Sequence, residues 1–104
     1  MMISVILPFY NENDTIQKTI DCLKNQTCLP DEVLFIDSGS IDDTAQIIKD
    51  NINTTQEFSL ILMHSGKMSP SSSINLGIKS AKHNMVMYID CGLHIPENWI
   101  ESQI

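Results

Sequence analysis

Two aspartates follow apolar runs whose composition is typical of buried strands. Asp37 follows the run Glu32–Ile36, and Asp90 follows the run Met85–Ile89. In an open parallel sheet, ligands bind beyond the carboxyl ends of the strands, so both carboxylates fall where a site would form. A carboxylate there can hydrogen-bond a nucleobase or a ribose, or hold a divalent metal ion that bridges phosphates.

A third candidate ligand region, Tyr10–Glu12, follows the first apolar run at the same expected edge of the sheet. Tyr10 offers a flat aromatic face on which a base can stack. An aspartate at a strand end is also ordinary turn chemistry, so either aspartate alone is weak evidence for a site. Together, the two aspartates and Tyr10 favour a ligand site.

The residues after Asp37 are typical of a turn followed by a helix start. Ser40 is expected to cap the helix, and Asp43, three residues later, completes a capping box. Asp42 and Asp43 would then lie in the first turn, where the helix dipole favours negative charge. Capping explains Ser40 and Asp43 but leaves Asp37 unexplained, which is why Asp37 is the leading candidate.

Apolar runs and helical stripes alternate along the chain. Strands are expected over Ile3–Leu7, stopped by Pro8, and over Glu32–Ile36, Ser59–Met63 and Met85–Ile89. Helices are expected over Thr15–Asn25, capped by Asn13 or Asp14, over Asp42–Ile52, and from Pro70 with Ser69 as its cap. Their apolar stripes are Ile16, Ile20 and Leu23; Ala45, Ile48 and Ile52; and Ile74, Ile78 and Ala81.

This order predicts one α/β domain, a Rossmann-like three-layer α/β/α fold with a mainly parallel sheet. After Asp90 the sequence indicates a turn and, around Pro96, the start of another helix. A natural domain seldom ends at such a point, so we expect the chain to be truncated or partial.

The composition excludes several classes of protein. A net charge of −7 over 104 residues argues against a nucleic-acid binder, which needs a basic face. No run approaches the roughly 20 apolar residues of a membrane span, and the N-terminus lacks the features of a signal peptide. The three cysteines, Cys22, Cys28 and Cys91, are expected to be free thiols, as in a reducing compartment. A cytoplasmic location is therefore expected. Membrane association through parts not in this chain is an alternative.

Five segments resemble the N-terminal nucleotide-binding half of the family 2 inverting glycosyltransferases, which have the GT-A fold. They lie in the family's order over nearly the whole chain, at residues 4–12, 23–27, 36–44, 75–78 and 88–90. The resemblance implies that residues 1–104 are the N-terminal nucleotide-sugar-binding part of a GT-A domain. It also implies transfer of a sugar, with inversion, from a nucleotide-diphosphate sugar to a sugar, lipid or protein acceptor. The acceptor-side half is missing, so the chain alone is expected to be inactive.

The resemblance assigns roles to residues by position. Pro8, Tyr10 and Glu12 would line the base and ribose pocket, and Asp37 would meet the base. Ser38 stands where many members carry a second aspartate. Further along the chain, Asn75 would lie near the phosphate end of the cleft, although Ile74 replaces an arginine often found before it.

Asp90 matches the first carboxylate of the family's D-x-D motif, which holds Mg²⁺ or Mn²⁺ on the diphosphate and neutralises charge on the leaving group. Here the motif reads Asp90-Cys91-Gly92, so the second carboxylate is missing. One carboxylate can still hold the metal if the diphosphate and waters supply the other ligands, so metal affinity without nucleotide should be poor. Cys91 is expected to be a small turn residue rather than a ligand for a softer metal.

No residue is assigned as the general base, which in the family normally lies in the second half of the fold. The histidines His64, His83 and His94 show no metal-ligand spacing and are expected at the surface or in loops. For His94, four residues past Asp90, an approach to the diphosphate is an alternative.

Two other readings stay open. A non-catalytic α/β module, binding a ligand or partner, is favoured by the degraded D-x-D motif and disfavoured by Tyr10, Asp37 and Asn75 together. A receiver or flavodoxin-like domain is weaker, because a receiver would cluster acidic residues where this chain has Pro8-Phe9-Tyr10.

Overall fold

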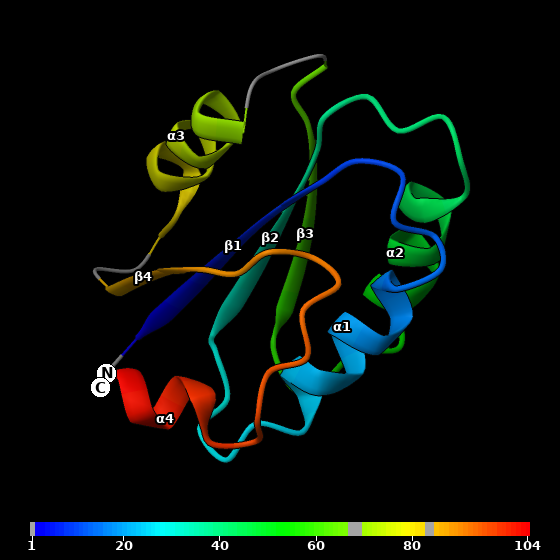
Figure 1. The fold of residues 1–104 in the computed structure, drawn as a ribbon. Coiled ribbons are helices and arrows are strands. Elements are labelled where there is room, and N and C mark those ends of the chain that lie inside the picture. Colours follow the sequence, from blue (N-terminus) through cyan, green and yellow to red (C-terminus); the bar gives the residue numbers. More distant parts are fainter. Residues whose placement is uncertain (1, 67–69, 83–84) are drawn as a thin grey trace.

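A single sheet of four parallel strands forms the middle layer of the protein (Figure 1). The computed structural model describes residues 2–66, 70–82 and 85–104. The strands are β1 (Ile3–Phe9), β2 (Glu32–Asp37), β3 (Ser59–His64) and β4 (Met85–Tyr88), in the order β3-β2-β1-β4. The helices are α1 (Ile16–Lys24), α2 (Thr44–Ile52), α3 (Pro70–Ser80) and α4 (Trp99–Gln103). The predicted α/β class and the predicted order of elements are confirmed.

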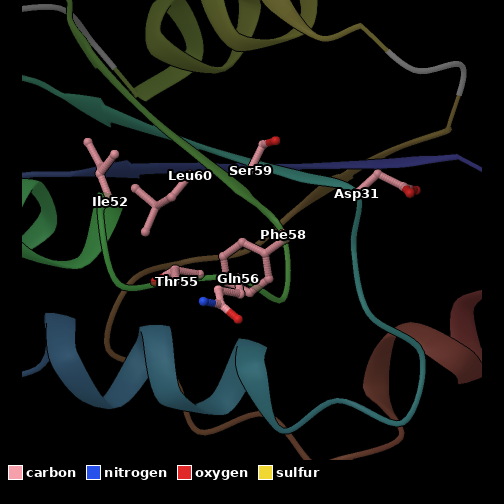
Figure 2. A pocket seen from close by; sticks show the side chains of 7 residues that line it. All are labelled: Asp31, Ile52, Thr55, Gln56, Phe58, Ser59 and Leu60. Atoms are coloured by element: carbon pink, nitrogen blue, oxygen red, sulfur yellow. The ribbon is translucent and has the colours of Figure 1, made fainter.

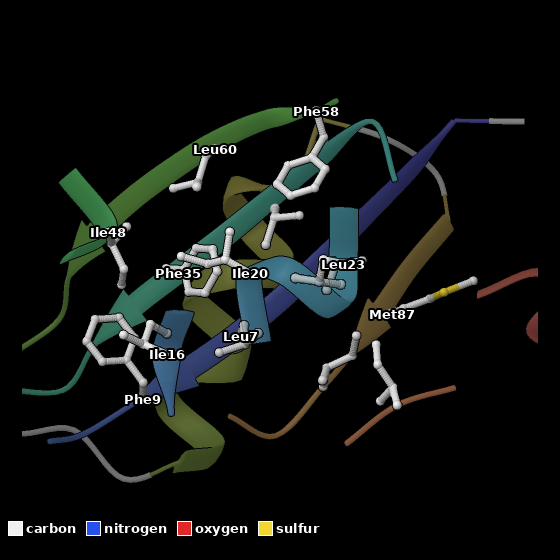
Figure 3. Close-up of a cluster of buried hydrophobic side chains, with 14 of the residues drawn as sticks. Leu7, Phe9, Ile16, Ile20, Leu23, Phe35, Ile48, Phe58, Leu60 and Met87 are labelled. Atoms are coloured by element: carbon white, nitrogen blue, oxygen red, sulfur yellow. The ribbon is translucent and has the colours of Figure 1, made fainter. Parts of the chain in front are cut away.

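The larger core lies between the sheet and the α1–α2 side (Figure 3). Side chains of a strand alternate between its two faces, and the odd-numbered apolar residues of β1 and β2 point to this core. Phe9 and Phe35 meet edge to face there, with ring centroids 6.4 Å apart. The predicted α1 stripe is confirmed, because its three members are all fully buried, namely Ile16, Ile20 and Leu23.

Helix α3 covers the opposite face and approaches it closely at Gly77. A Cβ placed on Gly77 would lie 2.5 Å from Ile6 Cγ2 and 2.8 Å from Ile36 Cδ1, so only glycine fits without a shift. The helix therefore turns Ser73 and Gly77 towards the sheet and leaves Ile78 50% exposed. The predicted stripe of Ile74, Ile78 and Ala81 is wrong, because close backbone packing replaces side-chain interdigitation on this face.

Helix α2 begins later, and packs differently, than the sequence predicts. It starts at Thr44, so Asp42 lies before the helix and Ser40 does not cap it; the N-cap residue, Asp43, makes no side-chain capping bond. Its buried positions are Thr44, Ile48 and Asn51, whereas Ile52 is 38% exposed. The small polar side chain of Thr44 is buried because it bonds another loop, as described below.

The N-termini of α1 and α4 also differ from the prediction, whereas that of α3 agrees with it. Thr15, not Asn13 or Asp14, is the N-cap residue of α1, and no side-chain capping bond is present there. Instead, the Glu12 carbonyl accepts hydrogen bonds from the N–H groups of Thr15 and Ile16. Helix α3 begins at Pro70 as predicted, while its expected cap, Ser69, lies outside the described residues. The last helix, α4, begins at Trp99, three residues later than Pro96.

Strand β1 continues through Pro8, contrary to the expectation that this proline would stop it. Pro8 pairs in register with Ile36 of β2. The Phe9 carbonyl accepts a bond from Ser38 N–H on the β2 side, and the Ile6 carbonyl accepts one from Ile89 N–H on the β4 side. Backbone groups of a strand alternate in direction, so Pro8 turns its missing N–H towards β4. The ladder between β1 and β4 accordingly ends at the pair Ile6–Tyr88.

Gln26, at the end of α1, anchors the last part of the chain. Its side-chain amide donates to the carbonyls of Cys22 and Pro96 and accepts a bond from Ile100 N–H at 2.9 Å. Gln26 and Ile100 are both buried, and this contact fixes α4 beneath the core. In the part of the chain that the structure describes, no helix is long and apolar enough to span a membrane.

Candidate functional site

The candidate site lies at the carboxyl edge of the sheet, where the chain changes its direction of travel across it. From β1 the chain moves outward to β2 and β3, and then returns to place β4 on the other side of β1. In open α/β sheets such a switch point opens a crevice beyond the strand ends. Asp37 and Asp90 lie on either side of the end of β1, so the sequence prediction that they share one edge is confirmed.

Asp37 is buried and its carboxylate is bonded within the turn that follows. Only 4% of the residue is exposed. Oδ1 accepts hydrogen bonds from the N–H groups of Gly39 at 3.1 Å and Ser40 at 2.7 Å. Oδ2 lies 3.3 Å from Nδ1 of His64. Helix capping leaves Asp37 unexplained, as expected, but the alternative of ordinary turn chemistry accounts for it, because Asp37 is itself the acceptor that shapes this turn.

Four hydrogen bonds join the loop after β1 to the loop after β2. Three consecutive backbone N–H groups donate to side chains of the second loop and of the first residue of α2: Asn11 to Ser40 Oγ at 2.9 Å, Glu12 to Thr44 Oγ1 at 2.9 Å, and Asn13 to Asp42 Oδ2 at 3.2 Å. In return, Ile41 N–H donates to Asn11 Oδ1 at 2.9 Å. We call these four bonds the loop latch. They hold the first and second candidate regions in one fixed arrangement.

Asp42 is the charged member of the loop latch. Partial burial alone would raise the pKa of its carboxyl, but hydrogen bonds from the side chain and backbone of Thr44 and from Asn13 N–H outweigh it, so the pKa is lowered. Thr44 is fully buried and bonds both loops, accepting from Glu12 N–H and donating to Asp42 Oδ1. This explains why a threonine, rather than an apolar residue, begins α2.

Asp90 sits in a different setting. It is exposed, two residues beyond the last ladder pair of β4, and its Oδ1 accepts a hydrogen bond from the hydroxyl of Tyr88. This bond raises the pKa of Tyr88 to about 12. The carboxylate is oriented by one side chain while remaining open to solvent.

The residues after Asp90 limit what the site can hold. Cys91 lies half-buried with its sulfur 3.8 Å from Thr19 Oγ1, and burial raises the pKa of the thiol to about 11. Cys91 lies in a turn, as predicted, and its sulfur points towards Thr19 of α1. Gly92, with φ of 90°, has no side chain that could bind a metal. Among the described residues, no group of three or more His, Cys, Asp or Glu side chains is arranged to hold a metal.

A divalent cation therefore fits this edge in one way. Mg²⁺ is usually held by one or two carboxylates together with substrate phosphates and waters. Asp90 can supply one carboxylate, and a bound diphosphate would have to supply other ligands. The chain's own residues fit a metal site that a nucleotide completes, and they do not form one beforehand.

The other predicted site residues surround the same edge. Pro8 is half-buried at the end of β1, and Tyr10 is 53% exposed just beyond it, so its ring is accessible for stacking. The carboxylate of Glu12 accepts a bond from Thr15 Oγ1 at 2.7 Å. Its Oε2 also lies 3.5 Å from where a Cβ on Gly92 would sit, so Glu12 faces the loop after Asp90.

Two predicted residues belong to the α3 side of the edge. The hydroxyl of Ser38 contacts the buried hydroxyl of Ser73 at 3.0 Å, which ties the turn after β2 to the start of α3. Asn75 is exposed on the same helix. The roles of these residues in ligand binding stay predictions.

A pocket of about 550 Å³ lies elsewhere, at the amino ends of β2 and β3 (Figure 2). Its lining contains none of the predicted site residues: Asp31, Ile52, Thr55, Gln56, Phe58, Ser59 and Leu60. Asp31 uses its carboxylate to accept a bond from Ile3 N–H at 2.6 Å, which fixes the start of β1. This pocket is remote from the candidate site.

Sequence reasoning missed the residues that hold the site together. Asn11 lies in the predicted ligand region Tyr10–Glu12, but the sequence assigns it no role. His64 is at the surface, as predicted, and it is the last residue of β3, beside Asp37. The available signal was the density of small polar side chains in both loops, each able to accept from a backbone N–H. His94 is exposed, and His83 lies outside the described residues.

A family model decides the classification. The model described as glycosyl transferase family 2 matches residues 4–104. The chain belongs to this family.

Relatives agree with that classification. Glycosyltransferase AglE of Haloferax volcanii is 30% identical over 104 residues, covering 98% of this chain and 34% of AglE. Poly-beta-1,6-N-acetyl-D-glucosamine synthase of Staphylococcus epidermidis is 33% identical over 97 residues, covering 92% of this chain and 23% of the synthase. The chain thus spans about a third or less of the length of these relatives.

Solved structures confirm the GT-A type of fold. TarS of S. aureus, residues 1–349 in complex with UDP-GlcNAc, matches with a TM-score of 0.85 and 25% identity, over 99% of this chain and 30% of that one. The mannosyltransferase PcManGT from Pyrobaculum calidifontis, in complex with GDP-Man and Mn²⁺, matches with a TM-score of 0.77 and 26% identity, over 85% and 26% of the two chains.

Proposed function

We propose that residues 1–104 are the N-terminal, donor-binding part of a glycosyltransferase domain that transfers a sugar from a nucleotide-diphosphate sugar to an acceptor with inversion. The observation that carries this proposal is the convergence of Tyr10, Asp37 and Asp90 on the carboxyl edge of the sheet, at its switch point. The UDP-GlcNAc and GDP-Man complexes of the two matching structures support a nucleotide-sugar donor.

The proposed arrangement has a nucleoside end and a diphosphate end. Tyr10 would stack on the base while Pro8, Glu12, Asp37 and Ser38 surround the base and ribose. Asp90 would face the diphosphate, with Asn75 nearby on α3. These assignments are consistent with an exposed aromatic ring beside a buried carboxylate, and with an exposed carboxylate across the end of β1.

Metal dependence is part of the proposal. Mg²⁺ or Mn²⁺, when bound by Asp90 and the diphosphate, would neutralise negative charge that develops on the leaving nucleoside diphosphate. With a net charge of −7, the chain needs such help to hold a polyanion. The Tyr88 hydroxyl would keep Asp90 oriented towards the ion.

The acceptor, the general base and the acceptor-side half of the domain are proposed to lie outside these residues. The small share of each relative that the chain covers supports this division. We therefore expect nucleotide binding, and no useful turnover, from the chain alone. A cytoplasmic site of action is proposed with it; the three cysteines, all free thiols in the structure, are in keeping with a reducing compartment.

Calorimetric titration with UDP and then GDP, each with Mn²⁺ and with chelator, tests the proposal. We expect one nucleotide to bind with Mn²⁺ and to bind at least tenfold more weakly with chelator or after Asp90→Ala. Asp50→Ala, which removes an exposed carboxylate on α2, is the matched control. A folded chain that binds neither nucleotide would refute the proposal.

A second candidate is a family member that has lost its chemistry and binds a ligand without transferring sugar. The observation that favours it is the sequence Asp90-Cys91-Gly92, with one carboxylate where the D-x-D motif has two. Binding that ignores Mn²⁺ but is lost on Asp37→Asn would support this candidate, because the nucleoside end would then work alone.

A further inference from the structure

Asn11 stands out in the loop latch because its backbone is strained. With φ of 51°, it is the one non-glycine residue with a left-handed backbone among residues 2–66, 70–82 and 85–104. Outside glycine this conformation is uncommon, although asparagine tolerates it better than most residues. Such strain persists only where the surroundings enforce it, and it clusters at functional sites.

The surroundings of Asn11 enforce this conformation from both sides. Its N–H donates to Ser40 Oγ at 2.9 Å, and its Oδ1 accepts from Ile41 N–H at 2.9 Å. The same residue is therefore both donor and acceptor to two successive residues of the other loop. Ile41 is 88% exposed, so its side chain gives its backbone no packing support, and the bond to Asn11 does so instead.

These bonds connect the two groups proposed to meet the base. Asp37 Oδ1 accepts from Ser40 N–H at 2.7 Å, Ser40 Oγ accepts from Asn11 N–H, and Asn11 directly follows Tyr10. The left-handed turn at Asn11 sets the direction in which the chain leaves Tyr10. The relative position of the Tyr10 ring and the Asp37 carboxylate thus depends on Asn11.

We infer that Asn11 is a positioning residue for the nucleoside end of the donor site, acting through its left-handed backbone and its side-chain bond to Ile41. This inference rests on the proposed function. Asn11 need not touch the ligand. Its effect is to keep Tyr10 and Asp37 at the spacing that a base requires before the ligand arrives, which avoids an ordering cost on binding.

Three substitutions separate the parts of this role. Asn11→Ala removes the acceptor and disfavours the left-handed backbone. Asn11→Gly removes the acceptor but allows the backbone conformation, and so remains informative if the alanine variant fails to fold. Asn11→Asp retains an acceptor and tolerates the backbone. The matched control is Asn13→Ala, since Asn13 is exposed in the same loop and contributes only its backbone N–H to the latch.

The readout is the Kd of each folded variant for UDP, or for GDP if the unaltered chain prefers it, and for the matching nucleoside, measured well below the midpoint of thermal unfolding. We expect a loss of about tenfold for Asn11→Ala, a smaller loss for Asn11→Gly, and Kd values within about twofold of the unaltered chain for Asn11→Asp and Asn13→Ala. The loss should be equal for nucleoside and nucleotide, because it lies at the nucleoside end.

A purely structural role has a different outcome. It would lower the unfolding temperature and the fraction of competent protein while leaving the Kd unchanged. Unchanged Kd values for both Asn11→Ala and Asn11→Gly, in a chain whose unaltered form binds nucleotide, would overturn this inference and leave the proposed function standing. Failure of the unaltered chain to bind UDP or GDP would refute both the proposed function and this inference.

Discussion

The two carboxylates at the edge of the sheet differ in how the chain supports them. Asp37 is buried, bonded by two backbone N–H groups and placed in a turn that the loop latch ties to the neighbouring loop. Asp90 is exposed and bonded by the Tyr88 hydroxyl. At the Asp37 end, hydrogen bonds within the chain fix the carboxylate. At the Asp90 end, the chain supplies a single carboxylate that one hydroxyl orients. For the proposed donor site, this difference means that the nucleoside end would be preformed, whereas the phosphate end would depend on ligands that the chain does not supply.

The largest expected contrast is in stability. Asp37→Ala leaves the N–H groups of Gly39 and Ser40 without their acceptor in a half-buried turn, and we expect it to lower the free energy of unfolding by about 2–3 kcal/mol. Asp90→Ala, at an exposed position, should change it by less than about 0.5 kcal/mol. Urea unfolding measures both. Equal losses of unfolding free energy in the two variants would contradict this difference between Asp37 and Asp90.

Removal of one hydroxyl from the loop latch should cost somewhat less. Thr44→Val keeps the shape of a fully buried side chain but leaves Glu12 N–H unpaired, so we expect a loss of about 1–2 kcal/mol in the free energy of unfolding. Thr44→Ser, which keeps the hydroxyl, is the matched control and should recover at least half of the loss. A valine variant as stable as the unaltered chain would mean that this bond contributes nothing.

The loop after Asp90 can be tested through its thiol. Because burial raises the pKa of Cys91 to about 11, we expect its alkylation by iodoacetamide at pH 8 to be at least tenfold slower in the folded chain than in urea. Mass spectrometry of the peptide that contains Cys91 measures the rate. Since the pKa is raised on folding, this thiol also contributes stability at neutral pH that is lost as the pH rises towards 11. Rapid alkylation would show that the loop opens.

The smallest expected effect concerns acid. Hydrogen bonds lower the pKa of Asp42 below its ordinary value of 3.8, so its stabilising contribution is present above that pH and is lost as the pH falls through the lowered value. We expect Asp42→Asn to reduce the loss of stability between pH 5 and pH 3, as measured by urea midpoints. Asp43→Asn is the control, because Asp43 is exposed and makes no side-chain capping bond. An equal acid dependence in all three chains would exclude Asp42 as a contributor.

The sequence was sufficient for the fold because the fold depends on patterns that one chain displays by itself. The apolar runs ending at Asp37 and Asp90, and the α1 stripe of Ile16, Ile20 and Leu23, follow from side-chain periodicity. The misplaced stripe of α3 had a different cause. Gly77 packs closely against the sheet because it has no side chain, and a pattern of hydrophobic residues cannot predict such a contact.

The site was predictable to a smaller extent. Strand ends identify Asp37, Tyr10 and Asp90 as neighbours, because parallel strands place their carboxyl ends together. The partners of Asn11 and Thr44 lie about 30 residues away in the sequence, and such bonds depend on how two loops meet in space. Local rules instead assigned Ser40 to a helix cap, which competes for the same hydroxyl oxygen.

Pro8 has an effect on Asp90 that neither residue reveals alone. In the register of β1 and β4, the pair after Ile6–Tyr88 would be Pro8 with Asp90. That pair needs a bond from the nitrogen of residue 8 to the carbonyl of Ile89, and proline has no hydrogen to give. The pairing of β4 with β1 therefore stops before Asp90, and the Asp90 carboxylate stays at the surface. A proline in β1 thus determines where β4 ends, and with it the position of the acidic residue that follows β4.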